Sequence, residues 1–455
     1  MKKFDLLEIP YLKAMLRSRW PQFLVTLIAL AGFLFAVMAG WLGTPVGSRN
    51  FAIIFVWIAW WALLMLVAVP VLGRGWCSIC PIPMPGEWLQ RGAVLGPLGA
   101  GGKGLKRRWP RPLRNIWLQN LAFTIVALFS IVVLTQPQVT AIVLAAFLFI
   151  AVGASLIFER RAFCRYLCPV GGFIGLYAQL APVELRVKDS AVCAGHTEKT
   201  CYTGNQDGYG CPWQVFPGGL TKNTYCGTCM ECLRTCPYDN IAINLRPVGA
   251  DLAVKSGRRM DEAIKAFIML ASAMAYAAVL QGPWGALKSA AYNIGSLDWL
   301  LYACAFLIFV YGLVPGLFYL AVWLGKTLAR SRQPTRREFT RFAYALVPLG
   351  LTAWIAFSLS FVFTNLSYLW SVLSDPLGWG WNLVGTAGIA WTPYLTHMLP
   401  GLQAVVLLAG MLWAGITAKR IARESLPARA GVIQATPVMI FCLAITLGLM
   451  LLLFG

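Results

Sequence analysis

The sequence is poor in charged residues. Only 12% of its 455 residues are charged, whereas a soluble globular protein has about 25%. Several apolar runs exceed the ~18 residues that mark a membrane-spanning helix. The scarcity of charge therefore excludes a soluble fold for most of the chain and predicts a polytopic membrane protein.

Histidine is almost absent. The chain holds two, His196 and His397, and only His397 lies near an apolar run. Haem b held by paired histidines needs two of them for each haem. We therefore expect no haem b in this chain, and any haem in the same pathway would belong to a partner.

Acidic residues are also few, with 17 Asp and Glu against 38 Lys and Arg and a net charge of +21. Nucleic acid is one explanation for such a balance, but it requires a basic patch on a soluble face. Here the basic residues lie between apolar runs, where the positive-inside rule places them. We therefore expect a membrane lipid environment and no nucleic-acid partner.

The apolar runs predict an all-α fold of about nine spans, at 21–42, 51–72, 116–134, 138–157, 264–281, 298–324, 343–363, 397–417 and 433–454. Residues 1–20 are basic and lead into the first run without a convincing cleavage site, which indicates a signal anchor. A cytoplasmic N-terminus leaves only Arg49 and Lys288 in outside loops. We expect a multi-pass protein of a prokaryotic cytoplasmic (inner) membrane.

The first four runs form two similar hairpins, and each ends in a cysteine pair followed by proline. The first pair is Cys77 and Cys80, and the second is Cys164 and Cys168. Both pairs follow a run that points inward, so all four cysteines should lie at one membrane face. They could bind a third iron–sulfur cluster, zinc or copper, form a redox disulfide, or hold no metal.

The most specific motif is Cys226-Gly-Thr-Cys229-Met-Glu-Cys232-Leu-Arg-Thr-Cys236-Pro. Three cysteines at two-residue gaps and a fourth before proline are typical of bacterial ferredoxins that bind 4Fe-4S clusters. A structural zinc site usually takes two separated pairs instead. This run therefore predicts iron–sulfur rather than zinc.

A degenerate partner motif lies upstream, with Cys193, Cys201 and Cys211-Pro212. In two-cluster ferredoxins the cysteine before proline ligates the other cluster. Cys211 would then join the first three cysteines of the run, and Cys236 would join Cys193 and Cys201. The second site lacks a fourth cysteine. Either His196 completes it, or it holds a 3Fe-4S cluster or an external ligand, or His196 is only an exposed loop residue.

The remaining half, from residue 264, has five predicted spans and no metal-type spacing. Cys304 and Cys442 lie inside apolar runs and should be core residues. The outer loop 364–396 is rich in tryptophan, which indicates an interfacial aromatic belt or, alternatively, a docking surface for a partner or a quinone.

The two span-end motifs, Cys77–Pro81 and Cys164–Pro169, followed by the run Cys226–Pro237, resemble the membrane-bound polyferredoxins. That family includes the quinol-dehydrogenase ferredoxin subunit of periplasmic nitrate reduction, the nitrous-oxide reductase maturation protein and the cytochrome oxidase assembly ferredoxin-like protein. The resemblance covers about residues 20–250 and implies electron transfer through two cytoplasmic 4Fe-4S clusters. The first pair departs from it, with CxxCP in place of CxxxCP.

Together these features predict three domains: four spans at 1–182, a cytoplasmic α+β ferredoxin-like module at 183–263, and five spans at 264–455. We expect a redox subunit of an oxidoreductase complex rather than a stand-alone enzyme. It would pass electrons between a quinol or cytoplasmic donor and haem-containing or quinone-reactive partners. The alternative is a copper-centre assembly or reduction factor that uses electrons from the module.

Overall fold

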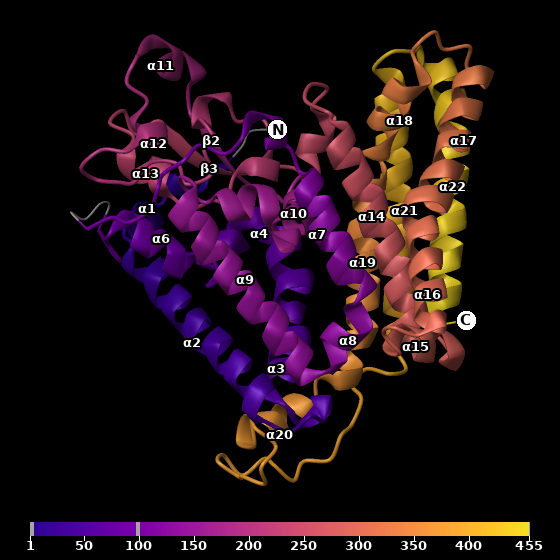
Figure 1. Cartoon of the computed structure of the whole chain (residues 1–455). Helices are drawn as coiled ribbons and strands as arrows, with labels where there is room; N and C mark the ends of the chain where they lie inside the picture. The colour runs from indigo at the N-terminus through magenta and orange to yellow at the C-terminus, as the bar shows by residue number, and fades with distance from the viewer. Residues whose placement is uncertain (1–3, 97–100, 455) are drawn as a thin grey trace. The chain divides into compact units, whose positions relative to one another are not determined.

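The computed structural model describes residues 4–96 and 101–454 and is mostly helical (Figure 1). The first half of the chain contains α1 (Pro10–Arg17), α2 (Trp20–Leu42), α3 (Phe51–Ile53), α4 (Val69–Leu72), α5 (Trp76–Ile79), α6 (Met84–Arg91), α7 (Trp117–Leu128), α8 (Ser130–Thr135), α9 (Pro137–Ile157), α10 (Pro169–Tyr177), α11 (Ser190–Gly195), α12 (Thr200–Thr203) and α13 (Glu231–Thr235). The second half contains α14 (Met260–Tyr276), α15 (Gly285–Tyr292), α16 (Leu297–Ile308), α17 (Val314–Leu328), α18 (Thr335–Ala343), α19 (Leu346–Asn365), α20 (Tyr368–Ser374), α21 (Leu399–Arg423) and α22 (Ala428–Phe454). The basic start of the expected signal anchor, residues 1–3, lies outside the described residues.

Eight helical stretches in the described chain are long and apolar enough to cross a membrane. They are Trp20–Leu42, Phe51–Ile79, Pro137–Ile157, Met260–Gln281, Leu297–Leu328, Thr335–Asn365, Leu399–Arg423 and Ala428–Phe454. Each of them overlaps one predicted span. The helices therefore support a multi-pass membrane protein.

One predicted span, at 116–134, is not found as one long helix. The structure divides it at Phe129, whose backbone (φ −93°, ψ 11°) leaves helical geometry between α7 and α8. The Phe129 ring stacks on Trp299 with 5.3 Å between centroids. This contact joins segments that are far apart in sequence, which is why hydropathy alone did not predict the division.

A small antiparallel sheet frames the cysteine-rich segment. Its strands are β1 (Phe4–Asp5), β2 (Val183–Val187) and β3 (Ile241–Leu245), in the order β1-β3-β2. Residue Val187 of β2 pairs with Ile241 of β3, so the long connection between these strands, which carries seven cysteines, leaves and re-enters the sheet at one end. The polar segment thus forms a compact α+β body with α11, α12 and α13 (Figure 1).

The N-terminal helix α1 is bound to the ferredoxin-type run. Lys13 forms an ion pair with Asp239 at 2.6 Å, and the Arg234 guanidinium donates to the carbonyl of Arg17 at 2.9 Å. Asp5 accepts a hydrogen bond from the backbone of Ile243 in β3. The first residues of the described chain are therefore part of the cysteine-bearing body.

The chain divides into two compact units. Unit 1 consists of Met1–Val37, Val67–Ala122 and Ile142–Val254, and unit 2 of Met38–Leu66, Phe123–Ala141 and Lys255–Gly455. Unit 1 holds every cysteine except Cys304 and Cys442. The three-domain division at 1–182, 183–263 and 264–455 stays a prediction.

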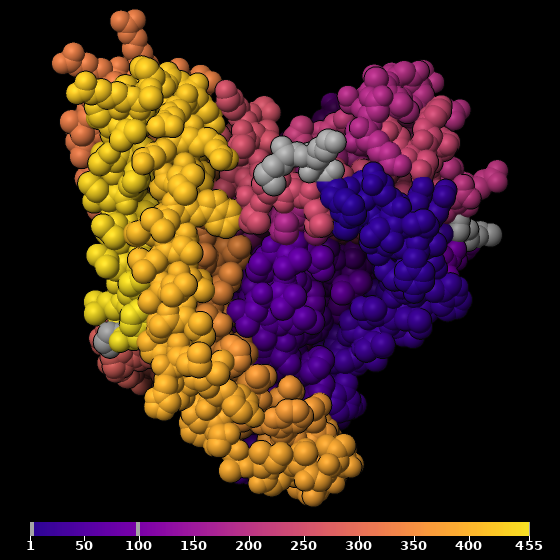
Figure 2. Space-filling view, turned by 180° about the vertical axis from the view of Figure 1, so that it is seen from behind, coloured from indigo at the N-terminus to yellow at the C-terminus, as the bar shows by residue number. Residues whose placement is uncertain are grey.

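Unit 2 is a helical bundle in which α21 packs between α19 and α22 and α22 also contacts α17. Figure 2 shows α21 and α22, in light orange and yellow, running side by side. Cys442 is buried in this bundle, as expected, but Cys304 is exposed on α16. The core assignment of Cys304 was therefore wrong. Its helix is apolar on all faces, so the sequence did not show which face points outward.

Two further features of unit 2 bear on the sequence predictions. Lys265, near the start of α14, is fully buried, with its Nζ 4.5 Å from the ring centroid of Phe123. In the loop 364–396 the tryptophans are exposed, and Trp379 and Trp381 meet edge to face at 5.2 Å. Exposed tryptophan fits an interfacial belt, and the docking alternative stays a prediction.

Candidate metal centres

The structure brings the four span-end cysteines together, and we call them the span-end group: Cys77, Cys80, Cys164 and Cys168. The thiols of Cys77 and Cys168 act electrostatically on Cys80, and all three act on Cys164. The prolines after each pair end the helices at this point. The two hairpins therefore deliver their cysteine pairs to one place, as the internal repeat predicts.

Cys168 also caps a helix. It occupies the N-cap of α10, and its Sγ accepts a hydrogen bond from the Gly171 backbone at 3.2 Å. Burial raises the pKa of the Cys168 thiol to about 11, while the Gly171 N–H and the nearby Arg74 act in the opposite direction. Helix N-termini stabilise negative charge, so this sulfur is prepared to be a thiolate once a metal offsets its burial.

A second set, the central group, contains Cys211, Cys226, Cys229 and Cys232. All four line one cavity with about 350 Å³ of empty space, walled by Leu185, Trp213 and Val215 among others. Cys211 acts electrostatically on each of the other three. This grouping is the one that the ferredoxin crossing rule predicts. Iron ligation by these four residues stays a prediction.

Backbone N–H groups point at the central sulfurs. The Val215 N–H donates to Cys211 Sγ at 3.4 Å, and the Thr228 and Glu231 amides donate to Cys226 and Cys229. Thr228 and Met230 adopt positive φ angles of 44° and 64°, which turn the loop around its sulfurs. Such N–H donors stabilise a negatively charged iron–sulfur cluster and raise its potential.

The third set, the loop group, contains Cys193, Cys201 and Cys236. Burial raises the pKa of the Cys201 thiol to about 11, and the thiols of Cys236 and Cys193 act on it in the same direction. Asn240 joins the other two sulfurs, because its side-chain Nδ2 donates to Cys193 Sγ and its backbone N–H to Cys236 Sγ, both at 3.4 Å. The second predicted set of cysteines is therefore also gathered.

His196 lies beside the loop group, one residue after the helix that carries Cys193. Its ring packs on Tyr238 at 4.7 Å between centroids. The Nδ1 atom is buried and has no hydrogen-bond partner among the described residues. A buried nitrogen without a partner is costly, and a metal would satisfy it. The ligand role of His196 stays a prediction that this atom favours.

None of the three groups is compact enough for one metal ion. In residues 4–96 and 101–454, no three His, Cys, Asp or Glu side chains gather closely enough to hold one. Four thiolates around a single zinc would lie ~3.8 Å apart, given Zn–S bonds of ~2.3 Å. A multi-iron cluster spreads its thiolates over the corners of a cube and needs more room. The cluster, zinc and copper alternatives at these groups stay predictions.

Two buried arginines connect the span-end and central groups. Arg74 acts on both Cys168 and Cys226, and Arg161 acts on Cys80, Cys164 and Cys229. Both side chains are at most 4% exposed. Positive charge held between two thiolate groups offsets the charge that clusters would bring.

The arginines also cross between the two hairpins. Arg161, from the second hairpin, donates to the carbonyl of Cys77 in the first at 3.0 Å. Arg74, from the first hairpin, donates to the carbonyl of Gly171 in the second at 2.7 Å. Each arginine lies three residues before the first cysteine of its own pair. This repeated register is the sequence signal that would have identified them, and our reading of them as loop cations missed it.

Trp213 fills the space beside the central group. The Arg74 guanidinium stacks 4.4 Å from its ring centroid, and its buried Nε1 has no hydrogen-bond partner in the described chain. The indole lies against Gly227, which lines the same cavity as the four central cysteines. An unpaired N–H at a cysteine-lined cavity fits a sulfur acceptor there, which supports a cluster as the missing group.

Gly227→Ala should therefore disrupt the central group. An added Cβ would stand 1.9 Å from Trp213 Nε1, and the ring is 1% exposed and cannot move away. We expect a loss of about 1–3 kcal/mol in stability and a lower iron content, measured by denaturant unfolding and iron assay. Gly195→Ala is the matched control, because its Cβ would meet nothing within 4 Å. Equal behaviour of the two variants would contradict this packing.

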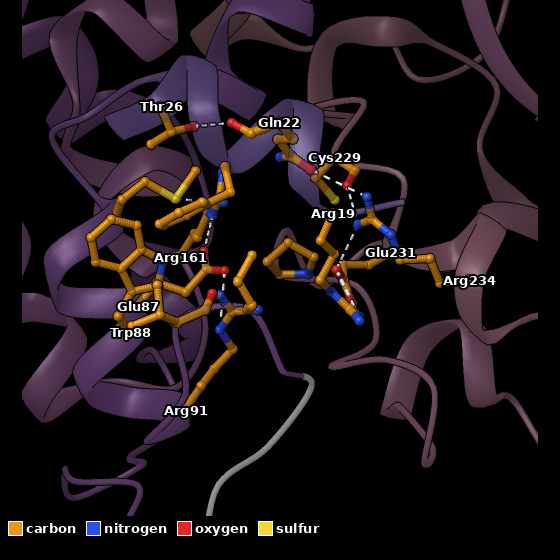
Figure 3. A pocket seen from close by; sticks show the side chains of 15 residues that line it. Arg19, Gln22, Thr26, Glu87, Trp88, Arg91, Arg161, Cys229, Glu231 and Arg234 are labelled. Carbon is orange, nitrogen blue, oxygen red and sulfur yellow. Dashed lines mark hydrogen bonds and ion pairs between the residues drawn. The ribbon is translucent and has the colours of Figure 1, made fainter. Parts of the chain in front are cut away.

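A polar cavity of about 440 Å³ reaches Cys229 from another side (Figure 3). On one wall Glu87 pairs with Arg161 and with Arg91, the latter at 3.6 Å. On the other wall Glu231 pairs with Arg19 at 3.1 Å and with Arg234 at 2.8 Å. Burial alone would raise the pKa of Glu87, but Arg161 and Arg91 hold it below its usual value. Glu87 is therefore an ionised carboxylate.

Comparison with known proteins agrees with an iron–sulfur assignment. Residues 53–112 and 140–188 match the family described as "4Fe-4S binding domain", and each segment contains one span-end cysteine pair. The "Putative electron transport protein YccM" of Escherichia coli is 27% identical over 207 residues, which cover 39% of this chain and 53% of that protein. The chain thus spans about half the length of the curated relative it matches. No solved structure matches.

These likenesses support an iron–sulfur electron-transport protein of the membrane. They do not distinguish the subgroups of the polyferredoxin resemblance. The segments that match the 4Fe-4S domain contain the span-end cysteine pairs and do not include the run Cys226–Pro237. This distribution is notable, because the span-end cysteines carry the weaker motif.

Proposed function

We propose that this chain is a membrane-bound electron-transfer subunit that binds iron–sulfur clusters at its span-end, central and loop groups. The observation that carries the proposal is the continuity of the three groups within unit 1. Cys211 of the central group acts on Cys201 of the loop group, and Arg161 acts on both central and span-end cysteines. Neighbouring groups of this kind can pass electrons in sequence.

The ligand sets follow from the groups. The central group supplies Cys211, Cys226, Cys229 and Cys232 to one 4Fe-4S cluster. The span-end group supplies four cysteines to another, supported by the match of the segments around both cysteine pairs to the 4Fe-4S domain. The loop group supplies three cysteines, and the unpaired Nδ1 of His196 supports a fourth ligand there. A 3Fe-4S cluster is the alternative at this position.

When bound, iron–sulfur clusters accept and release single electrons without rearrangement of the chain. The residues of the chain set the conditions for this transfer. Backbone amides of Val215, Thr228 and Gly171 donate to the sulfurs, while Arg74 and Arg161 place positive charge between two groups. The buried thiols of Cys229 and Cys232 in the central group lie away from water.

The cavity of Figure 3 is our proposed entry point for a quinol donor. It combines the aromatic rings of Phe23 and Trp88, whose centroids lie 5.9 Å apart, with the ionised carboxylate of Glu87. Quinol oxidation releases two electrons and two protons, and the cavity would bring the quinol beside Cys229 of the central group, where the electrons would enter. A cytoplasmic donor at the same edge is the alternative, and partner redox proteins would take the electrons onward.

The positive-inside pattern supports a cytoplasmic position for the N-terminus and the three groups. Their thiols require a reducing compartment to remain free for metal. We therefore propose a multi-pass protein of a prokaryotic inner membrane.

The test is spectroscopy of the full-length protein, purified without oxygen and reduced stepwise. We expect EPR signals from at least two different clusters. Cys232→Ser should abolish the signal of the central cluster, and Cys201→Ser that of the loop cluster, because each removes one ligand. Cys304→Ser is the matched control, since Cys304 is exposed and outside all three groups. A folded anaerobic sample without iron would contradict the proposal.

A further inference from the structure

Unit 2 contains a large basic cavity that the electron-transfer proposal does not use. It has about 1560 Å³ of empty space, part of which is open to solvent. Five cationic side chains and one carboxylate line it: Lys255, Arg258, Arg336, Arg337, Arg341 and Glu424. No cysteine lies in its lining. The cavity is therefore a separate site with a strong excess of positive charge.

Ion pairs hold two of the cationic side chains of this cavity, Arg258 and Arg341, in place. Arg258 donates to both carboxylate oxygens of Glu424 at 2.7 Å, and Arg341 donates to the same carboxylate at 3.1 Å. Arg341 also pairs with the buried Glu338 at 2.6 Å. Burial alone would raise the pKa of Glu424, but Arg258 and Arg341 hold it below its usual value. Two arginines are thus held in place by bidentate and shared pairing.

The other three cations remain available. Lys255, Arg336 and Arg337 are exposed, and none has an acidic partner within 4 Å in residues 4–96 and 101–454. Two helices also begin at this cavity, α14 at Met260 and α18 at Thr335, and their first turns carry carboxylates, of which Asp261 accepts from the Glu262 N–H at 3.0 Å and Glu338 pairs with Arg341. Helix N-termini add partial positive charge. The site suits an anion with more than one negative oxygen.

The surrounding structure indicates where such an anion comes from. The cavity lies where the long apolar stretches Met260–Gln281, Thr335–Asn365 and Leu399–Arg423 begin or end. In the same unit an apolar groove of about 1120 Å³ runs between α17 and α22, from Leu317 to Leu328 and from Ile433 to Ala444. Basic cavities between spans on the cytoplasmic side recognise anionic lipid headgroups. Apolar grooves along spans suit acyl chains.

We propose that this cavity binds the phosphate headgroup of an anionic phospholipid. The shared chemistry is a phosphate oxygen against guanidinium and ammonium groups, and the source is the cytoplasmic leaflet of the membrane. A scatter of cations that only follows the positive-inside rule would not converge on one cavity. If the cations followed only the positive-inside rule, removing any three of them from the cytoplasmic face would weaken lipid binding equally. If the cavity is a binding site, removing its own cations should weaken lipid binding more.

The experiment uses the full-length protein in detergent, freed of lipid and titrated with short-chain phosphatidylglycerol or phosphatidylcholine, with binding measured by native mass spectrometry. The test variant is Lys255→Gln with Arg336→Gln and Arg337→Gln. The matched control is Lys103→Gln with Arg108→Gln and Arg111→Gln, which removes the same charges from exposed positions of unit 1.

We expect the wild type and the control to bind phosphatidylglycerol more tightly than phosphatidylcholine. The test variant should bind it on the order of tenfold more weakly. Equal losses in test and control variants would overturn the site, because charge alone would then explain binding. Inorganic phosphate that binds as tightly as the lipid would overturn the lipid as the source. Cluster spectra should be unchanged in all variants, so the result is separate from the electron-transfer proposal.

Discussion

Replacing both Cys80 and Cys168 with serine should lower the iron content of the anaerobically purified protein from about twelve to about eight atoms per chain. The span-end group would lose one ligand from each hairpin, which leaves too few thiolates for a cluster. Central and loop cysteines lie on other segments and should keep their iron. Iron and acid-labile sulfide per chain, measured together, check this expectation.

Cys80 and Cys168 are chosen because their side chains are the more exposed ones of the span-end group. Cys80 and Cys168 are half-buried, whereas Cys77 and Cys164 are buried, so serine at the first two positions is better tolerated. A double variant of Cys304 and Cys442 serves as the control, because neither lies in a cysteine group. The span-end group would be excluded as a cluster site if the wild type held about eight iron atoms per chain and the variant held the same number. A disulfide or no metal would then remain for these cysteines.

The grouping of the cysteines in space could be predicted from the sequence, whereas their role as cluster ligands stays a prediction. Ligand spacing in the run Cys226–Pro237 is local, and the crossing of Cys211 and Cys236 follows from a known arrangement of such runs. The span-end pairs could be placed together because two hairpins of the same direction end in the same motif. In both cases the chain itself encodes the distance between the ligands.

The electrostatic surroundings were harder to predict. Arg74 and Arg161 were counted as ordinary inner-face cations, because hydropathy assigns a basic residue to a loop without saying what it contacts. Their repeated position, three residues before a cysteine pair, was present in the sequence. The contact across the hairpins depends on how the two hairpins pack, and no local pattern carries that information.

The membrane spans were predicted well in position and less well in number. Runs of apolar residues define a span through its length alone, and eight of the nine expected spans overlap long helices. At the division, Phe129 stacks on Trp299, a residue 170 positions away. Similarly, Cys304 lies on a uniformly apolar helix, where no periodicity distinguishes the buried face from the exposed one.

Arg161→Gln should be among the most destabilising single substitutions in unit 1. Arg161 is 4% exposed and Glu87 5% exposed, and they form a direct ion pair. Removal of Arg161 leaves the buried Glu87 carboxylate with Arg91, at 3.6 Å, as its remaining counter-ion, so the cost should lie at or below the ~3–5 kcal/mol of a buried pair that loses one partner outright. Arg161 also donates to the Cys77 carbonyl, so the span-end group should lose order as well. Denaturant unfolding in detergent micelles, followed by circular dichroism, measures the loss.

The double variant Arg161→Gln with Glu87→Gln distinguishes the ion pair from other roles of the arginine. If the loss of stability in Arg161→Gln arises from the Glu87 carboxylate left without Arg161, the double variant should be about 0.5–3 kcal/mol more stable than the sum of the two single losses predicts. The span-end cluster should show a lowered reduction potential in the Arg161→Gln variant, because positive charge near Cys80 and Cys164 is gone, and a smaller shift in the double variant, because the Glu87 carboxylate is removed as well. A double variant that recovers no stability, or a potential that does not move when Arg161 is lost, would contradict the two roles assigned to this side chain.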